Sequence, residues 1–216
     1  MVSRGTYDAL MRLPMLVFVV FAAGTQVAGL QHVASAPIDA AYVIHVAMRL
    51  STIAFLLLIA AVVILRHRPT EKARGLEPRV SALVGTFLIY GFLLFPRREL
   101  SLPLETISTI LIMLGSVGAV LSLSQLGRSF SVMAETRQLV TSGPYRFVRH
   151  PLYLTEGIAV IGLFVQFASV WTALLVVVQI AFQLRRMHNE ETLLIASFPE
   201  YAAYSKNTAR LIPGMY

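Results

Sequence analysis

The sequence predicts an all-α, polytopic membrane protein with about six membrane segments, the last two forming a helical hairpin, followed by a C-terminal interfacial helix. Three observations lead to this prediction. The 216-residue chain is 56% hydrophobic and 13% charged, which is about half the charged share of soluble domains. Its apolar residues form long blocks without strand-like alternation. Its basic residues collect in alternate loops between those blocks.

The composition also excludes several classes of protein. Because so apolar a chain has ample surface to bury, intrinsic disorder is excluded. The absence of cysteine excludes disulfide frameworks, thiolate metal sites and cysteine nucleophiles. The five histidines are scattered without acidic partners at ligand spacing, so no metal site is predicted. Loop charges that set membrane orientation account for the net charge of +7, so no nucleic-acid partner is expected.

Four apolar blocks, residues 13–30, 41–65, 80–95 and 107–126, are each long enough for a membrane helix. We expect the first to remain as an uncleaved anchor, because removing a signal peptide there would reverse the sidedness of every later loop. Residues 1–126 form the predicted four-helix membrane scaffold within a single integral membrane domain, residues 1–216. Four glycines are expected to allow close helix packing, namely Gly24, Gly29, Gly115 and Gly118.

The next apolar block covers residues 152–184. As one helix it would extend about 50 Å, well beyond the roughly 30 Å hydrocarbon core. We therefore predict a helical hairpin that bends between residues 166 and 172, where Gln166, Ser169 and Thr172 offer polar partners to the helix ends. Whether each short arm crosses the whole bilayer stays open.

Basic residues indicate the orientation of the chain. With the N-terminus and the C-terminus in the cytoplasm, every Lys and Arg except Arg49, Arg97 and Arg98 falls on the inner side, as the positive-inside rule requires. We expect a bacterial inner membrane. Arg49 lies within the second block, with His45 on the same helical face; a structural role and a role in an acceptor pocket are both open.

Polar residues gather at the predicted cytoplasmic end of residues 127–216, the expected cofactor-binding and catalytic half. Pro151 suits the first position of a helix, because it lacks the N–H that would be unpaired there. His150 then lies at the helix N-terminus, where backbone donors favour an anionic group, and Arg149 adds another donor. Three other loop arginines are interpreted as membrane anchors, namely Arg128, Arg137 and Arg146.

The return arm of the hairpin ends in a second polar cluster. Arg186 and Glu190 are four residues apart and share a helix face. Glu190 and Glu191 diverge by about 100°, so only one of them can face a common pocket. The last segment, residues 198–214, is expected to lie in the membrane interface as a cover, with Tyr201 and Tyr204 as interfacial anchors.

Several of these motifs together resemble the isoprenylcysteine carboxyl methyltransferase family, whose superfamily includes phospholipid N-methyltransferases. Residues 139–145 read LVTSGPY, residues 149–153 read RHPLY and precede Gly162, and Arg186 stands four residues before Glu190. The ending, FPEY at 198–201 and LIPG at 211–214, is similar to bacterial members. Residues 127–131 read GRSFS, where many relatives have an Asn-Trp pair, a departure that concerns substrate choice.

The resemblance implies the cofactor S-adenosyl-L-methionine (SAM), bound between the hairpin and the C-terminal segment. We expect His150 and the helix terminus to hold the cofactor's carboxylate, and Tyr145 and Tyr153 to pack against its adenosyl group. The candidate catalytic residues are Arg149, Arg186 and Glu190. The candidate cofactor-binding residues are Val140, Gly143, Tyr145, His150, Tyr153 and Glu191.

The expected activity is SAM-dependent methyl transfer to a lipophilic acceptor that enters from the membrane lipids. O-methyl transfer to a carboxylate is favoured, because a cation and an anion neutralise each other and no base is needed. An amine acceptor would need a proton acceptor such as Glu190, and a thiol acceptor is also open. The alternatives are a phospholipid N-methyltransferase, an NADPH-dependent membrane reductase of the sterol-reductase type, and a non-enzymatic carrier or scaffold.

Overall fold

The computed structural model describes residues 4–33 and 38–214, and it confirms the predicted helical membrane fold. The chain forms two compact units, Met1–Arg68 and Pro69–Tyr216. Each unit is described by itself below. The predicted division into a scaffold and a catalytic half after residue 126 concerns function, and it stays a prediction.

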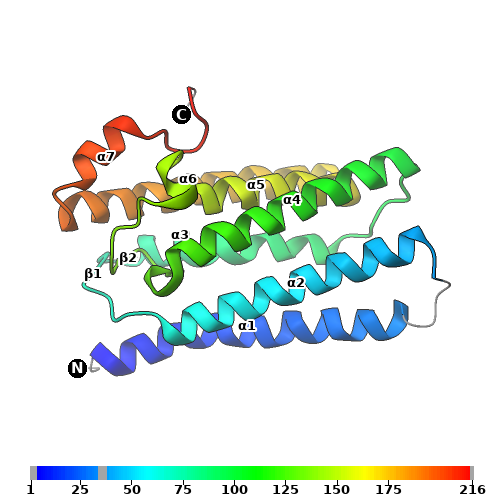
Figure 1. The fold of residues 1–216 in the computed structure, drawn as a ribbon, viewed down its shortest axis with the longest axis horizontal. Helices are drawn as coiled ribbons and strands as arrows, with labels where there is room; N and C mark the ends of the chain where they lie inside the picture. The colour runs from blue at the N-terminus through cyan, green and yellow to red at the C-terminus, as the bar shows by residue number, and fades with distance from the viewer. Residues whose placement is uncertain (1–3, 34–37, 215–216) are drawn as a thin grey trace. The chain divides into compact units, whose positions relative to one another are not determined.

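The first unit is a pair of helices, α1 (Arg4–Val33) and α2 (Ala40–Leu65), that lie side by side (Figure 1). Arg49 on α2 donates a hydrogen bond to Gln26 Oε1 on α1, at 3.3 Å, while His45 is exposed. Gly29 lies against the Arg49 side chain, whereas a Cβ at Gly24 would meet no atom within 4 Å. The predicted packing role is therefore wrong for Gly24.

The second unit is built around two helix pairs, in which α4 lies along α5 and α3 lies along α6 (Figure 1). A Cβ at Gly115 would lie 2.6 Å from the Thr155 carbonyl oxygen, and one at Gly162 would lie 2.8 Å from the Ser108 carbonyl oxygen. Only glycine permits such close backbones, so the packing role predicted for Gly115 is confirmed, as is that of Gly118. The elements are α3 (Glu77–Phe87), the 3-10 helix η1 (Leu88–Leu94), α4 (Leu102–Leu126), α5 (Pro151–Phe167) and α6 (Val170–Ser197).

The hairpin between α5 and α6 bends at Ala168 and Ser169, within the predicted segment. The Ser169 hydroxyl accepts from the Thr172 N–H at 3.1 Å, and the Thr172 hydroxyl accepts from the Ser169 N–H at 2.9 Å. This reciprocal capping box satisfies helix-end donors. The 28 residues of α6 extend about 42 Å at 1.5 Å per residue, so this helix is longer than a bilayer core is thick.

Within the described residues, five helices are long and apolar enough to cross a membrane, and the chain is an integral membrane protein. These candidate spans lie in α1, α2, α3 with η1, α4, and α6. The sixth predicted segment, α5, is apolar but has 17 residues. Large apolar side chains such as Leu94 and Val170 are more than 80% exposed in the isolated chain, as lipid-facing residues should be.

Several connecting segments of the second unit lie at one end of its helices (Figure 1). Two short strands, β1 (Glu71–Lys72) and β2 (Glu135–Thr136), pair antiparallel and join the segment before α3 to the loop after α4. The all-α prediction missed this pair. The loop continues through the 3-10 helices η2 (Gly127–Ser129) and η3 (Gly143–Arg146), and α7 (Tyr201–Asn207) lies at the same end (Figure 1).

Candidate functional site

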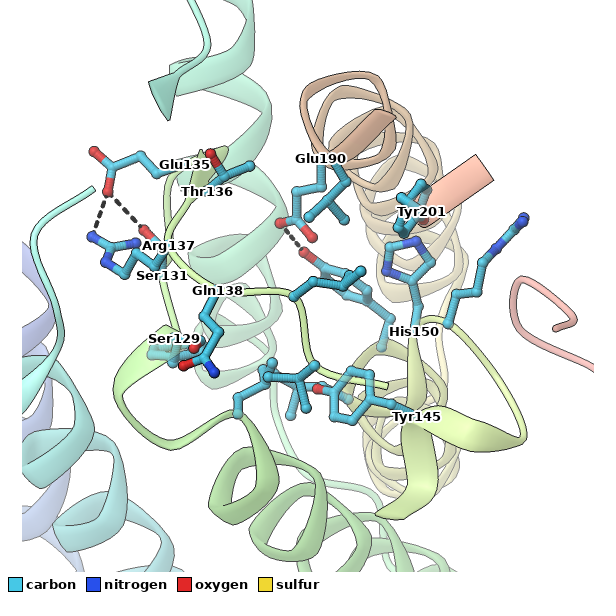
Figure 2. A pocket seen from close by; sticks show the side chains of 18 of the residues that line it. Ser129, Ser131, Glu135, Thr136, Arg137, Gln138, Tyr145, His150, Glu190 and Tyr201 are labelled. Carbon is cyan, nitrogen blue, oxygen red and sulfur yellow. Dashed lines mark hydrogen bonds and ion pairs between the residues drawn. The ribbon is translucent and has the colours of Figure 1, made fainter. Parts of the chain in front are cut away.

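A cavity of about 120 Å³ lies where the loop after α4 meets α5, α6 and α7 (Figure 2). The tips of the hairpin contribute to the same cavity, as predicted. Gly143 and Glu191 are the two predicted site residues that do not line it. Seven predicted site residues do line it: Val140, Tyr145, Arg149, His150, Tyr153, Arg186 and Glu190.

The N-terminus of α5 forms one wall of the cavity. Pro151 occupies the first helical position, as expected, and His150 precedes it in a non-helical conformation. The chain there is held against the C-terminal segment, because the Arg149 and His150 N–H groups donate to the carbonyls of Ala209 (2.8 Å) and Arg210 (3.1 Å). The free donors of the first turn of α5 make this wall suitable for an anionic group.

Glu191 links three elements behind the cavity wall. Its Oε1 lies 3.0 Å from both Arg149 Nε and His150 Nε2, and its Oε2 lies 3.2 Å from Arg210 Nε. Arg149 also donates to the Ser205 carbonyl oxygen at 2.7 Å. Glu191 therefore ties α6 to the start of α5 and to the C-terminal segment, and it acts on the cavity through Arg149 and His150.

Arg186 and Glu190 form a second cluster in the cavity lining, together with Tyr153. Arg186 Nε lies 3.2 Å from Glu190 Oε1, and the Tyr153 hydroxyl donates to the same oxygen. The guanidinium also lies over the Tyr153 ring and donates to Thr86 Oγ1 at 2.9 Å and to the Ser131 carbonyl oxygen at 3.4 Å. Of the two adjacent glutamates only Glu190 lines the cavity, which confirms the expectation drawn from the helical repeat.

Gly143 shapes the loop that carries Tyr145. Its φ of +58° lies in the left-handed region, and a Cβ there would be 2.8 Å from Gln125 Cγ. Only glycine suits both constraints. The next residues form η3, which brings Tyr145 into the cavity wall, so the contribution of Gly143 in this structure is a backbone turn.

Helix α7 covers the cavity with two tyrosines. Tyr201 is 2% exposed and lines the cavity, so the prediction that it is an interfacial anchor is wrong. Tyr204 also lines it and donates a hydrogen bond to the Tyr145 carbonyl oxygen. Burial raises the pKa of Tyr145 and Tyr201 well above the usual range and that of Tyr204 to about 12. All three phenols therefore stay protonated at neutral pH.

Sequence reasoning missed a cluster formed by β2 and the residues on either side of it. Arg137 Nη2 pairs with Glu135 Oε2 at 2.7 Å, and the Ser131 hydroxyl donates to the same oxygen at 3.0 Å (Figure 2). Both charged side chains are almost fully buried, so the prediction that Arg137 anchors the protein to the membrane surface is wrong. Their spacing of two residues places them on one side of an extended strand, which is the only sequence signal for the pair.

These features define a polytopic membrane protein with a polar cavity at the end of a helical hairpin. Residues 104–201 match the model of the phospholipid methyltransferase family. The matched segment includes α5, the start of α7 and all the candidate site residues. The match confirms the resemblance to the methyltransferase superfamily that includes this family.

Two curated bacterial proteins are similar to about half of the chain. The cobalt-zinc-cadmium resistance protein CzcN of Cupriavidus metallidurans is 33% identical over 114 residues, covering 50% of this chain and 51% of that protein. The nickel-cobalt-cadmium resistance protein NccN of Alcaligenes xylosoxydans xylosoxydans is 29% identical over 112 residues, with 50% and 52% coverage. The chain thus spans about half the length of these relatives.

A solved structure with similarity along the chain is that of the eukaryotic intramembrane Ras methyltransferase ICMT, an isoprenylcysteine carboxyl methyltransferase. It has 15% sequence identity and a TM-score of 0.48, and the alignment covers 99% of this chain and 98% of that one.

Proposed function

We propose that this chain is a SAM-dependent membrane methyltransferase that acts on a lipophilic acceptor. The observation that carries the proposal is the meeting of the two hairpin tips in one cavity, whose lining holds Arg149 and His150 at the start of α5 together with the carboxylate of Glu190 on α6. Such a cavity suits a ligand that has a carboxylate at one end and a cationic centre nearby. The family match at residues 104–201 supports the same reaction.

The charges near the start of α5 support the position proposed for the cofactor's carboxylate. Arg149 and Arg210 both lie close to the Glu191 carboxylate, at 3.0 and 3.2 Å, so basic side chains gather beside the start of α5. The α5 N-terminus, with Arg149 in the cavity lining, favours an anion. Tyr145 and Tyr153 supply ring surface for the adenosyl group.

The Glu190 carboxylate is the group in the cavity lining that suits the cationic part of the cofactor. Tyr153 and Arg186 both engage Oε1 of Glu190, so Oε2 of Glu190 is the oxygen left for a ligand. When bound, the cofactor supplies a methyl group on a sulfonium. The task of the chain is to hold the acceptor atom in line with that methyl group at about 3 to 3.5 Å.

For the acceptor we favour a carboxylate, because its reaction cancels two charges in a site of low dielectric and needs no base. A lipid amine is the runner-up, and Glu190 Oε2 would then take its proton. The exposed apolar surfaces of α4, α5 and α6 support entry of the acceptor from the bilayer. We propose that the cavity lies on the cytoplasmic side of a bacterial inner membrane and that both termini are inside, because the positive-inside rule assigns the basic loops of the sequence to that side.

The test combines cofactor binding with product identification. Purified protein is titrated with S-adenosylhomocysteine and with NADPH, and labelled SAM is then incubated with native membrane lipids, whose labelled product is identified by mass. We expect binding of S-adenosylhomocysteine and loss of labelling in Arg186→Ala and Glu190→Ala. Tight binding of NADPH alone would show that the protein is a reductase and not a methyltransferase. Binding of neither ligand would favour a carrier or scaffold. Full turnover with normal cofactor affinity in either variant would remove that residue from the site.

A further inference from the structure

We propose that Thr86 is a positioning residue that holds the Arg186 guanidinium in its productive orientation, an inference that rests on the function proposed above. Thr86 lies on α3, within the predicted membrane scaffold of residues 1–126. It is not among the described residues that line the cavity. Its effect on the reaction would therefore pass through Arg186.

The hydrogen bonds of Thr86 have a defined direction. Its hydroxyl lies 2.7 Å from the Ala82 carbonyl oxygen, to which it donates its single hydrogen. Because that hydrogen is used, the Thr86 oxygen can only accept from Arg186, whose Nη1 donates to Thr86 Oγ1 at 2.9 Å. The backbone of α3 thus orients the hydroxyl, and the hydroxyl orients the guanidinium.

The other contacts of Arg186 do not replace this one. The Ser131 carbonyl oxygen is 3.4 Å from Nη2, which is long for a hydrogen bond, and the Glu190 contact uses Nε. Arg186 is 5% exposed, so bulk water cannot readily take the place of a lost partner. A buried charged donor without an acceptor is costly, and we expect the guanidinium to turn away from Glu190 when the Thr86 hydroxyl is removed.

The experiment compares turnover and cofactor affinity in Thr86→Val, which keeps the shape and loses the hydroxyl, and in Thr86→Ser, which keeps the hydroxyl. Thr106→Val is the matched control, because the Thr106 hydroxyl makes the same bond to a carbonyl one turn earlier, on exposed α4 surface. We expect Thr86→Val to lower kcat at least about tenfold. The Kd for S-adenosylhomocysteine should change less than about twofold, and Thr86→Ser should restore most of kcat.

Two results would overturn the inference: full kcat in Thr86→Val, or an equal loss of kcat in Thr86→Ser. A double-mutant cycle with Arg186→Met, followed by thermal unfolding, tests the same contact without turnover. Thr86→Val should lower Tm in the natural background and have little effect beside Arg186→Met, whereas additive shifts would contradict the inference. If the unsubstituted protein methylates no lipid, the proposed function fails, and this cycle still decides whether Thr86 holds Arg186.

Discussion

Replacing Glu191 with glutamine removes the negative charge that joins the hairpin to the C-terminal segment. In the structure this carboxylate lies within 3.2 Å of nitrogen atoms of Arg149, His150 and Arg210. Glutamine keeps the size and one acceptor oxygen but brings two N–H donors toward three groups that are themselves donors. We expect the start of α5 to separate from α6 and the cover to loosen.

The expected size follows from the burial of these groups. Breaking a fully buried ion pair by removing one partner costs about 3 to 5 kcal/mol. The side chains of Glu191, Arg149 and Arg210 are 13–15% exposed, which lets some water reach the uncompensated arginines. We therefore expect the free energy of unfolding to fall by about 2 to 3 kcal/mol, less than for a fully buried ion pair. In a chain of this size that corresponds to a decrease in Tm of about 4 to 12 °C.

Thermal unfolding in detergent, with and without S-adenosylhomocysteine, measures this effect. Glu77→Gln is the control, because Glu77 also pairs with an arginine of α6, Arg185 at 2.7 Å, but both side chains are about half exposed. Exposed pairs of this kind contribute little to stability. A Tm of Glu191→Gln equal to that of Glu77→Gln would refute the argument that Glu191 is the structural link behind the cavity.

Two further predictions concern helix packing and the cover. Gly115→Ala should lower Tm by several degrees, because the added Cβ would overlap the backbone of α5, whereas Gly24→Ala should be neutral or stabilising in open space; equal Tm values would contradict this. The protein should lose stability as the pH rises above about 10, and Tyr204→Phe should reduce this loss. Because the folded pKa of Tyr204 is raised to about 12, its contribution is complete below the unfolded pKa, about 10, and is lost as pH rises toward 12. Thermal unfolding between about pH 9 and 12 measures the difference, and parallel curves for the variant and the natural chain would exclude this role.

The helix ends of the hairpin could be predicted because their signals are local. Pro151 suits only the first turn of a helix, and a helix spanning both arms would be far longer than a bilayer. Ser169 and Thr172 cap each other three residues apart, so the bend follows from a short stretch of sequence. The helical repeat likewise predicts that Glu190 and Glu191 point to different sides of α6, because the spacing of two residues in a helix determines the angle between their side chains.

The features that were missed depend on contacts between distant segments. Strand β1 has two residues, and its partner β2 lies beyond α4, so neither carries a periodic signal of its own. Thr86 accepts a hydrogen bond from Arg186, which lies 100 positions later in the chain. In the sequence it is one threonine within an apolar block, where a bond to its own helix is the ordinary expectation.

Arg137 shows why charge patterns predict sidedness better than they predict burial. The positive-inside rule counts Arg and Lys in loops, and Arg137 satisfies it whether the side chain faces lipid head groups or the protein interior. What decides between these states is a compensating carboxylate, since an unpaired buried guanidinium would be too costly. Glu135 stands two residues away, on the same side of an extended strand, and pairs with it at 2.7 Å. An acidic residue two positions from an arginine in an extended loop segment is therefore the signal that separates this buried pair from Arg128, whose immediate sequence neighbours include no carboxylate.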